Sequence, residues 1–291
     1  MTTGRRRSQA ILRLGLVQTR ATADIERNLA AADRLIGVAA KRGAEIVCLP
    51  ELFAARYFAQ VEDREFLELA EPIPGRISRF LQAAAKRHRI TLVGGSLYER
   101  ARDGKRYNTT LIYGRSGRVL GKYRKMHIPH DPKYYEQFYF EPGNLGYIQV
   151  PAGKAVVSPL ICYDQWFPEA ARINAMRGAQ VIFYPTAIGW FDELKRDEPF
   201  SARRWEDAMR SHASMNGIFV AGVNRVGREG TLRFWGGSFI ADPFGEVVAR
   251  ASRTREDALV ADIDLRRIRE SQEGWGFLRN RRPASYRALA R

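Results

Sequence analysis

The sequence predicts an α/β fold, in one domain, in which helices cover β-sheets. Segments with strand patterns alternate with segments of helical period along most of the 291 residues. Several strands are joined directly by short turns, as in antiparallel meanders. No linker rich in Pro, Gly or Ser divides the chain, and 45% hydrophobic with 27% charged residues is a globular composition. These observations exclude disordered, collagen-like and disulfide-scaffold proteins.

The first half predicts a β-α-β start followed by a meander. In order, the elements are strand 11–18, helix 24–43, strand 45–51, helix 76–89, and strands 90–100, 108–114 and 119–125. Asp24 is expected to cap the first helix and Gly43 to end it. Turns around Asp103-Gly104 and Ser116-Gly117 separate the last three strands.

The second half repeats the alternation of strands and helices. Its elements are strand 155–164, helix 168–178, strand 181–185, helix 201–217, and strands 218–224, 238–243, 246–252 and 257–265. Interleaving of this kind is typical of sheets with helices on their faces. We expect one domain over residues 10–291, including a C-terminal extension, after a basic tail at residues 1–9.

The charge distribution limits the expected partners. With 48 Lys plus Arg and 32 Asp plus Glu, the net charge is +16, but tight basic runs occur only at residues 5–7 and 281–282. No nucleic-acid-binding motif is present, and no apolar run approaches the ~18 to 20 residues that span a bilayer. The N-terminal apolar stretch is broken by Arg13, unlike a signal peptide. The sequence therefore predicts a cytoplasmic protein that binds neither nucleic acid nor membranes.

The two cysteines have different contexts. Cys48 lies within an apolar strand, where a small buried hydrophobe is the expected role. Cys162 ends an apolar strand shortly before the helix that starts at Pro168, where a helix N-terminus lowers a thiol pKa and presents a nucleophile. On placement alone, a structural role and a catalytic role for Cys162 remain equally open.

The four histidines give only a weak metal signal. His88 lies in a charged helix end and is expected to be solvated, and His212 has apolar neighbours typical of a core residue. His127 and His130 are closely spaced and adjoin Asp131, but two histidines without a third ligand signature do not define a metal site. A metal site is an open but disfavoured alternative.

Three polar residues each end a predicted strand. Glu51 ends strand 45–51, Lys125 ends strand 119–125, and Cys162 lies near the end of strand 155–164. Functional groups of α/β sheets gather at the carboxyl ends of strands, so we expect these three to converge at one edge of a sheet. Read alone, Glu51 would be an exposed loop charge.

The segments around these residues resemble a known family. LPELF, GKYRKMHIP and LICYDQWFPEAAR resemble, in the same order, the three catalytic blocks of the nitrilase superfamily of carbon-nitrogen hydrolases. The resemblance runs from about Leu12 to Tyr286. ELAEPIPG, DPKYYEQFYFEPGN, YPTAIGW, NRVG, RFWG and FLRNRR resemble the branch that hydrolyses N-carbamoylputrescine. This resemblance implies an α-β-β-α sandwich, paired into a homodimer or a higher homo-oligomer.

The resemblance also implies a catalytic scheme. Glu51 would take the thiol proton of Cys162, and the thiolate would attack an amide or ureido carbon. Lys125 and the backbone N–H of Tyr163 would stabilise the oxyanion, and Glu136 would support Lys125. Such a scheme requires no metal and no organic cofactor.

The substrate implied by the resemblance is a small molecule, N-carbamoylputrescine, which would yield putrescine, carbon dioxide and ammonia. Tyr57 and Trp166 are implied as substrate-binding residues. The distal ammonium of this substrate calls for an acidic partner, sought first at Asp192 and Glu193 in an acidic segment that also contains Asp197 and Glu198.

Other functions remain open on the sequence. WFDELKRDEP, after TAIGW, departs from the expected branch pattern, and His130 stands where the family often has aspartate. These departures leave another N-carbamoyl amine, an N-carbamoyl amino acid or an aliphatic amide as alternative substrates. A different class, an inactive nitrilase-like binding protein, is disfavoured because the residues of all three blocks are present.

Overall fold

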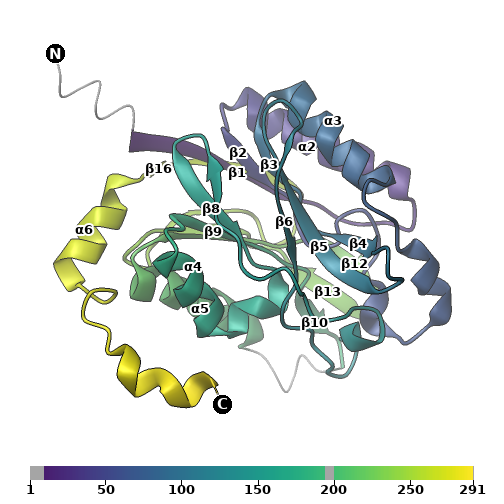
Figure 1. Ribbon diagram of the computed structural model, residues 1–291. Helices are drawn as coiled ribbons and strands as arrows, with labels where there is room; N and C mark the ends of the chain where they lie inside the picture. Colours follow the sequence, from purple (N-terminus) through teal and green to yellow (C-terminus); the bar gives the residue numbers. More distant parts are fainter. Residues whose placement is uncertain (1–9, 194–199, 291) are drawn as a thin grey trace.

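Two β-sheets pack face to face, and helices cover their outer faces (Figure 1). The computed structural model describes residues 10–193 and 200–290 of the chain. The predicted tail at residues 1–9 lies outside these ranges. The layers are therefore α-β-β-α, as the family resemblance implied. None of the helices in the described ranges is long and apolar enough to cross a bilayer.

The first sheet has seven strands in the order β16-β1-β2-β3-β5-β4, with β6 paired to β5. Its strands are β1 (Ile11–Gln18), β2 (Ile46–Cys48), β3 (Thr91–Val93), β4 (Leu97–Arg100), β5 (Arg106–Tyr113), β6 (Val119–Arg124) and β16 (Asp257–Asp264). The strands β1, β2 and β3 run parallel, while β16 closes one edge antiparallel to β1.

The second sheet has six strands in the order β15-β14-β11-β9-β8-β7. Its strands are β7 (Val150–Ala152), β8 (Ala155–Pro159), β9 (Val181–Pro185), β11 (Phe219–Val223), β14 (Phe239–Ala241) and β15 (Val247–Arg250). A third, small sheet was not predicted and consists of β10 (Gly189–Phe191), β13 (Leu232–Trp235) and β12 (Val226–Glu229).

The outer layers are two pairs of helices. On the first sheet lie α2 (Ile25–Lys41) and α3 (Arg76–His88), and on the second lie α4 (Pro168–Met176) and α5 (Ser201–Asn216). Asp24 caps α2 as predicted, because its carboxylate accepts a hydrogen bond from the Arg27 N–H. After β16 come α6 (Arg266–Trp275), which was not predicted, and a 3-10 helix, η5 (Pro283–Ala290).

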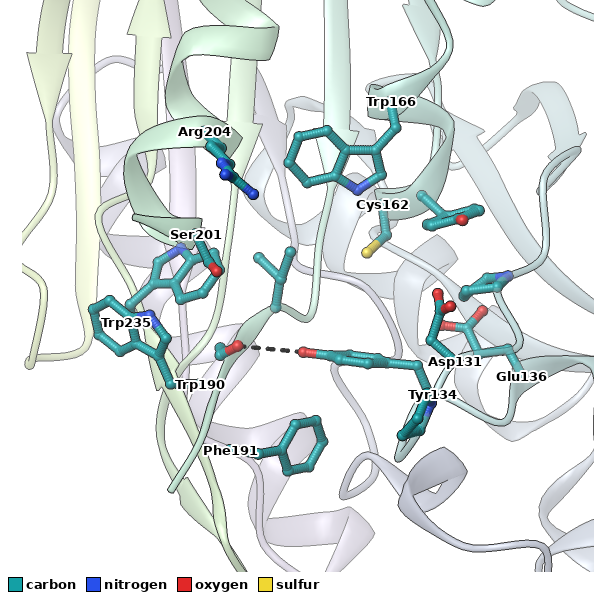
Figure 2. A pocket seen from close by; sticks show the side chains of 15 residues that line it. Asp131, Tyr134, Glu136, Cys162, Trp166, Trp190, Phe191, Ser201, Arg204 and Trp235 are labelled. Carbon is teal, nitrogen blue, oxygen red and sulfur yellow. Dashed lines mark hydrogen bonds between the residues drawn. The ribbon is translucent and has the colours of Figure 1, made fainter. Parts of the chain in front are cut away.

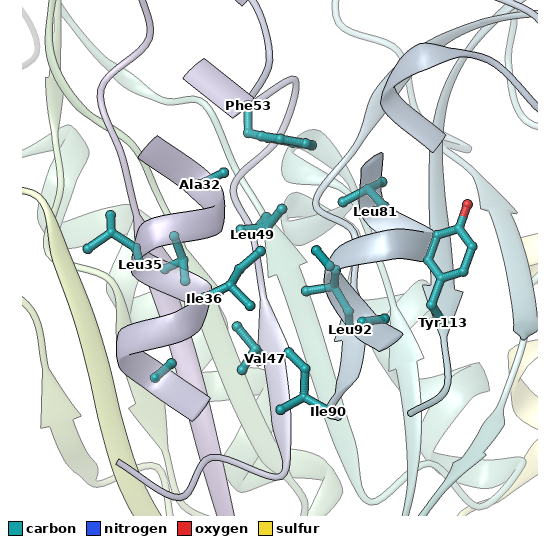
Figure 3. Packing of buried hydrophobic residues seen from close by; sticks show 14 of the residues in the cluster. Ala32, Leu35, Ile36, Val47, Leu49, Phe53, Leu81, Ile90, Leu92 and Tyr113 are labelled. Atoms are coloured by element: carbon teal, nitrogen blue, oxygen red, sulfur yellow. The ribbon is translucent and has the colours of Figure 1, made fainter. Parts of the chain in front are cut away.

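Side-chain alternation explains the layering. In β1, Leu12, Leu14 and Leu16 point into the core between the two sheets. Val17 points the other way, into the core shared with α2 and α3. Figure 3 shows that second core, where side chains of the two helices meet those of β2 and β3.

Two of the predicted strands differ from the expectation for identifiable local reasons. Segment 90–100 is divided into β3 and β4 at Gly94-Gly95, where Gly95 has a φ of +61°. A Cβ at Gly95 would lie 2.1 Å from the Pro50 carbonyl oxygen, so only glycine allows this approach. Strand 155–164 ends at Pro159, and a 3-10 turn, η4 (Cys162–Trp166), follows.

Candidate active site

Three of the predicted residues, Glu51, Lys125 and Glu136, meet at the buried ammonium group of Lys125. Lys125 directly follows β6, and its Nζ donates to Glu51 Oε1 at 2.8 Å and to Glu136 Oε2 at 2.6 Å. The side chains of Lys125 and Glu51 are fully buried, and that of Glu136 is 1% exposed. The two carboxylates raise the pKa of Lys125 despite its burial, so the ammonium stays charged.

The sequence suggested that these groups gather at one edge of a single sheet, but the structure shows a different arrangement. Glu51 follows β2 and Lys125 follows β6, both in the seven-stranded sheet, whereas Cys162 follows β8 in the six-stranded sheet. The site therefore forms where the ends of two sheets meet. The prediction of convergence was right about the residues and wrong about the single edge.

Glu51 is held by three hydrogen-bond donors. Besides Lys125, Asn108 Nδ2 donates to Oε1 at 2.8 Å, and the backbone N–H of Ala187 donates to Oε2 at 2.9 Å. A carboxylate surrounded only by donors acts as an acceptor with both oxygens, which is the pattern of the ionised form. The same Ala187 N–H also interacts with the Cys162 thiol.

Glu136 begins a 3-10 turn, η3 (Glu136–Phe138), and links Lys125 to Tyr57. The Tyr57 hydroxyl donates to Glu136 Oε1 at 2.8 Å. Burial and the charge of Glu51 outweigh Lys125 and raise the pKa of Glu136 to about 7. Tyr57 itself is buried behind Glu136 and does not line the cavity described below. The structure thus gives Tyr57 a supporting contact rather than the expected substrate contact.

Cys162 has a strained backbone that its surroundings hold in place. Its φ is +41°, in the left-handed region that non-glycine residues rarely adopt. The carboxylate of Asp164 accepts from the Ile161 N–H at 2.8 Å, the His127 N–H at 3.0 Å and the Tyr123 hydroxyl at 2.8 Å. These contacts fix the turn around the cysteine, as is typical of strained residues at functional sites.

The predicted lowering of the thiol pKa is wrong. Burial raises the pKa of Cys162 well above its ordinary value, and the charge of Glu51 raises it further. Lys125 acts in the opposite direction but only partly offsets these effects. Because η4 separates Cys162 from α4, the thiol is not placed at the start of that helix. The thiol is therefore protonated at rest, next to a carboxylate that can accept its proton.

The histidines have structural partners. His127 Nδ1 lies 2.7 Å from Asp164 Oδ1, and the His127 ring stacks on Phe167 with centroids 3.7 Å apart. His212 is buried as predicted, but His88 pairs with Asp33 at 2.9 Å and is mostly buried rather than solvated.

The ring of His130 packs edge-on against Tyr135. Within residues 10–193 and 200–290, no group of three or more His, Cys, Asp or Glu side chains could hold a metal ion.

A cavity of about 660 Å³ opens above Cys162 and Glu136 (Figure 2). This volume is in the range of small-molecule sites. Tyr163 and Trp166 line it, as expected of one oxyanion residue and one substrate-binding residue. The small third sheet and α5 complete the wall. The remaining lining residues are Pro129, Asp131, Pro132, Tyr134, Ile188, Gly189, Trp190, Phe191, Ser201, Arg204 and Trp235.

The acidic residues expected to face the substrate do not line this cavity. Asp192 forms an ion pair with Arg228, and Glu193 forms one with Lys133. Besides Glu136, the cavity lining contains the acid Asp131, which the sequence suggested only as a weak metal ligand.

Two further residues of the acidic segment, Asp197 and Glu198, lie outside the described residues.

A buried arginine supports the loop that carries Glu51, and the sequence did not reveal it. Arg225 is fully buried, and its Nη2 donates to the carbonyl oxygens of Leu52 at 3.3 Å and Ala55 at 2.6 Å. Glu229 accepts from the Tyr57 N–H at 2.6 Å. Arg225 belongs to the NRVG segment, but nothing in that pattern indicates that its side chain is buried.

Comparisons with known proteins identify the family of this chain. A family model described as carbon-nitrogen hydrolase matches residues 13–273. Fold and match together define an enzyme that hydrolyses carbon–nitrogen bonds. The chain belongs to the carbon-nitrogen hydrolase family.

Relatives within the family have different substrates in their names. The N-carbamoylputrescine amidase of Oryza sativa subsp. japonica is 41% identical, covering 92% of this chain and 91% of that protein. The citrullinase of Francisella tularensis is 35% identical, covering 97% and 99%. The crystal structure of a carbon-nitrogen hydrolase from Helicobacter pylori G27 has a TM-score of 0.92 at 35% identity, covering 97% of this chain and 99% of that one.

Proposed function

We propose that this chain is a cysteine-dependent amidohydrolase that converts N-carbamoylputrescine and water to putrescine, carbon dioxide and ammonia. One observation carries the proposal: a buried lysine lies between two buried carboxylates beside a strained cysteine, at the floor of a cavity. The similarity to the rice N-carbamoylputrescine amidase supports the choice of substrate.

The first step is a proton transfer coupled to attack. The Cys162 thiol is neutral at rest, because burial and Glu51 raise its pKa. Glu51 takes the thiol proton as the sulfur bonds to the ureido carbon, so no free thiolate accumulates in a buried site. The three donors around Glu51 keep its carboxylate oriented for this transfer.

The tetrahedral intermediate then needs a positive partner for its oxygen. The Lys125 ammonium is held in place by Glu51 and Glu136, and it needs no reorganisation when negative charge develops. The N–H of Tyr163, near the start of η4, supplies a second donor. One such donor is typically worth about 3 to 4 kcal/mol in the transition state.

Ammonia leaves first and water completes the reaction. Glu51 returns its proton to the departing nitrogen, and the carbon–nitrogen bond breaks to leave a carbamoyl group on the Cys162 sulfur. Water, deprotonated by Glu51, attacks this thioester-like carbon and restores the thiol. The released carbamate loses carbon dioxide and leaves the free amine, so one water is consumed for each ammonia.

The distal ammonium of the substrate requires a carboxylate in the cavity. Asp131 takes this role, because it lines the cavity and none of the ion pairs among the described residues includes it. Asp192 and Glu193 are already paired with the chain's own cations. A carboxylate binds an ammonium more strongly than a neutral group does, and an uncharged analogue would leave that carboxylate unpaired. A cationic substrate is therefore favoured over an uncharged analogue.

The protein is also proposed to assemble as a homodimer or a higher homo-oligomer. Met176 and Met215, on α4 and α5, are 50% and 54% exposed, and Trp275 at the end of α6 is 63% exposed. Exposed large apolar side chains on neighbouring outer helices favour a protein interface. Light scattering of the purified chain measures the mass of the particle, and a monomer at all concentrations would contradict this assembly.

Ammonia release from a panel of substrates tests the proposed function. The panel consists of N-carbamoylputrescine, uncharged alkylureas, N-carbamoyl amino acids and aliphatic amides, with putrescine measured separately. We expect the highest kcat/KM for N-carbamoylputrescine, with equal amounts of ammonia and putrescine released. Absence of ammonia from every member of the panel would contradict the amidohydrolase assignment.

A further inference from the structure

Both carboxylates that hold the Lys125 ammonium are tied to one short segment of the chain, residues 51–57. Glu51 begins this segment, and its carboxylate accepts from Lys125 Nζ. Tyr57 ends it, and the Tyr57 hydroxyl donates to Glu136 Oε1 at 2.8 Å. The path of the segment 51–57 therefore affects how both carboxylates are placed around the ammonium.

The segment 51–57 has a strained backbone directly after Glu51. Leu52 has a φ of +45°, in the left-handed region that residues other than glycine rarely adopt. Such a conformation persists only where the surrounding structure holds it. The Leu52 N–H donates to Ser96 Oγ at 2.9 Å, and its carbonyl oxygen accepts from Arg225 Nη2 at 3.3 Å. Two distant parts of the chain thus hold the strained turn.

Arg225 and Glu229 also hold the rest of the segment. Arg225 Nη2 donates to the Ala55 carbonyl oxygen at 2.6 Å, and Glu229 Oε2 accepts from the Tyr57 N–H at 2.6 Å. Arg225 directly precedes β12, and Glu229 is the last residue of that strand. Two neighbouring side chains of the small third sheet therefore hold the middle and the end of the segment.

Stability alone gives a poor account of this pair. The side chains of Arg225 and Glu229 are 0% and 3% exposed, and their closest charged atoms are 3.6 Å apart. That distance is too long for a hydrogen bond between them. Moving two charges out of water costs free energy, which their attraction recovers only in excellent geometry. Their short hydrogen bonds go instead to the backbone of the segment 51–57.

We propose that Arg225 and Glu229 are positioning residues of the reaction, which hold the segment 51–57 and thereby both carboxylates of the site. This inference rests on the amidohydrolase function proposed above and adds two residues to its machinery. Neither residue is among the described side chains that line the cavity. Their loss should therefore change the rate of the bound substrate and the ionisation of Glu136, and it should leave substrate binding intact.

Replacing the whole pair with apolar side chains separates positioning from stability. Arg225→Met/Glu229→Leu leaves no charge buried without its partner, and replacements of this kind are often neutral or stabilising. We expect kcat for N-carbamoylputrescine to fall by about 10²-fold, as when a reacting group is displaced by about 1 Å. KM should stay close to the wild-type value. Circular dichroism and denaturant titration measure how much of the variant is folded.

A second pair variant and a control accompany this one. Arg225→Gln/Glu229→Gln is also uncharged, but it keeps an amide donor for the carbonyl oxygens and an amide oxygen for the Tyr57 N–H. Its kcat should therefore lie between those of the first variant and the wild type. Asp242 is a buried carboxylate outside the site, paired with Arg267 of α6. Asp242→Asn should leave kcat and the pH profile unchanged.

The pH profile provides a readout that a purely structural role would not move. Burial raises the pKa of Glu136, Lys125 lowers it, Glu51 raises it, and the hydrogen bond from the Tyr57 hydroxyl lowers it. When the pair variant releases Tyr57, the acid limb of kcat/KM should move to higher pH by about one to two units. Tyr57→Phe should give the same shift, and combining the two changes should not enlarge it.

The inference and the proposed function fail in different ways. A folded pair variant with wild-type kcat and an unmoved acid limb would contradict the inference and leave the proposed function standing. Failure of both pair variants to fold would assign Arg225 and Glu229 to stability and would also contradict it. Absence of ammonia release by the wild-type enzyme would contradict the proposed function. Infrared titration of the Glu136 carboxyl band, assigned by its absence from Glu136→Gln, then still measures the effect of the pair on this ionisation.

Discussion

The charges at the floor of the cavity differ in almost every physical respect from those at its rim, a name we use for Asp192, which directly follows the lining residue Phe191, and its partner Arg228. Lys125 and its two carboxylates are buried and fixed by several hydrogen bonds. At the rim, Asp192 and Arg228 form an ion pair whose side chains are 39% and 54% exposed. Exposed pairs contribute about 0 to 1 kcal/mol, whereas unpairing a buried ion costs several times more. The buried charges of the floor are therefore positioned for catalysis, whereas the exposed rim charges mainly neutralise one another.

The largest expected effect is at Cys162. Cys162→Ala or Cys162→Ser should reduce turnover by at least about 10³-fold, because no other group supplies the nucleophile and a hydroxyl is much harder to ionise. Ammonia release from N-carbamoylputrescine measures this loss, and circular dichroism checks that the fold is intact. More than a few per cent of activity in the folded Ala variant would contradict the cysteine mechanism.

A stability measurement compares floor and rim directly. Lys125→Met leaves Glu51 and Glu136 buried without their cation, so the free energy of unfolding should fall by about 3 to 5 kcal/mol. Arg228→Met, at the exposed rim, should change it by no more than about 0.5 kcal/mol. Denaturant titration of both variants provides the values, and equal losses would remove the distinction between the two regions.

The pH dependence of kcat/KM should reflect the protonation of the Glu136 carboxyl. Both its oxygens accept hydrogen bonds, from Tyr57 and Lys125, so the ionised form has the observed geometry. With a pKa raised to about 7 by burial and by Glu51, this carboxyl gains a proton as the pH falls below 7. We therefore expect kcat/KM to rise with pH through an apparent pKa near 7.

The variant Glu136→Gln cannot take up that proton. The acid limb should disappear from its profile, and its rate on the plateau should be lower by roughly 10²-fold, as when a catalytic group loses its position. The profile is measured as kcat/KM from pH 5 to 9. An unchanged acid limb in Glu136→Gln would assign it to another group.

A smaller effect should distinguish the cavity acid from the rim acid. Wild-type enzyme should prefer N-carbamoylputrescine over butylurea by about 30- to 150-fold in kcat/KM, and Asp131→Asn should erase most of that ratio. Asp192→Asn is the matched control, because its carboxylate is paired with Arg228 and does not line the cavity. A loss of preference in Asp192→Asn alone would restore the rim acid as the ammonium partner.

Removal of metal should have no effect. Glu51 and Lys125 perform the acid–base and electrostatic steps for which other hydrolases use a metal ion. Exhaustive chelation followed by the ammonia assay should leave kcat unchanged. Loss of activity that one added metal restores would reopen the site at His127 and His130.

Local patterns predicted the strands, the helices that cover the sheets and the positions of three residues of the floor, whereas the α-β-β-α order and the role of Glu136 came from the family resemblance. Alternating leucines define the faces of β1, and Glu51, Lys125 and Cys162 belong to motifs at the ends of strands. Where the prediction failed, the outcome depends on contacts between residues that are far apart in the sequence. Asp192 looked available until its ion pair with Arg228, 36 positions away, was known. Likewise, the pKa of the Cys162 thiol is raised by burial and then by carboxylates, and only the fold produces either effect.

The reactivity of the two thiols tests the central claim most directly. Wild-type protein treated with iodoacetamide is analysed by intact-mass and peptide mass spectrometry while its ammonia-releasing activity is followed. Cys162 opens to the cavity beside Glu51, which can take the thiol proton during alkylation as it does in the proposed mechanism, whereas Cys48 is fully buried. We therefore expect one adduct, at Cys162, with activity lost in proportion and with protection by N-carbamoylputrescine. Full activity after complete labelling of Cys162 would contradict the account.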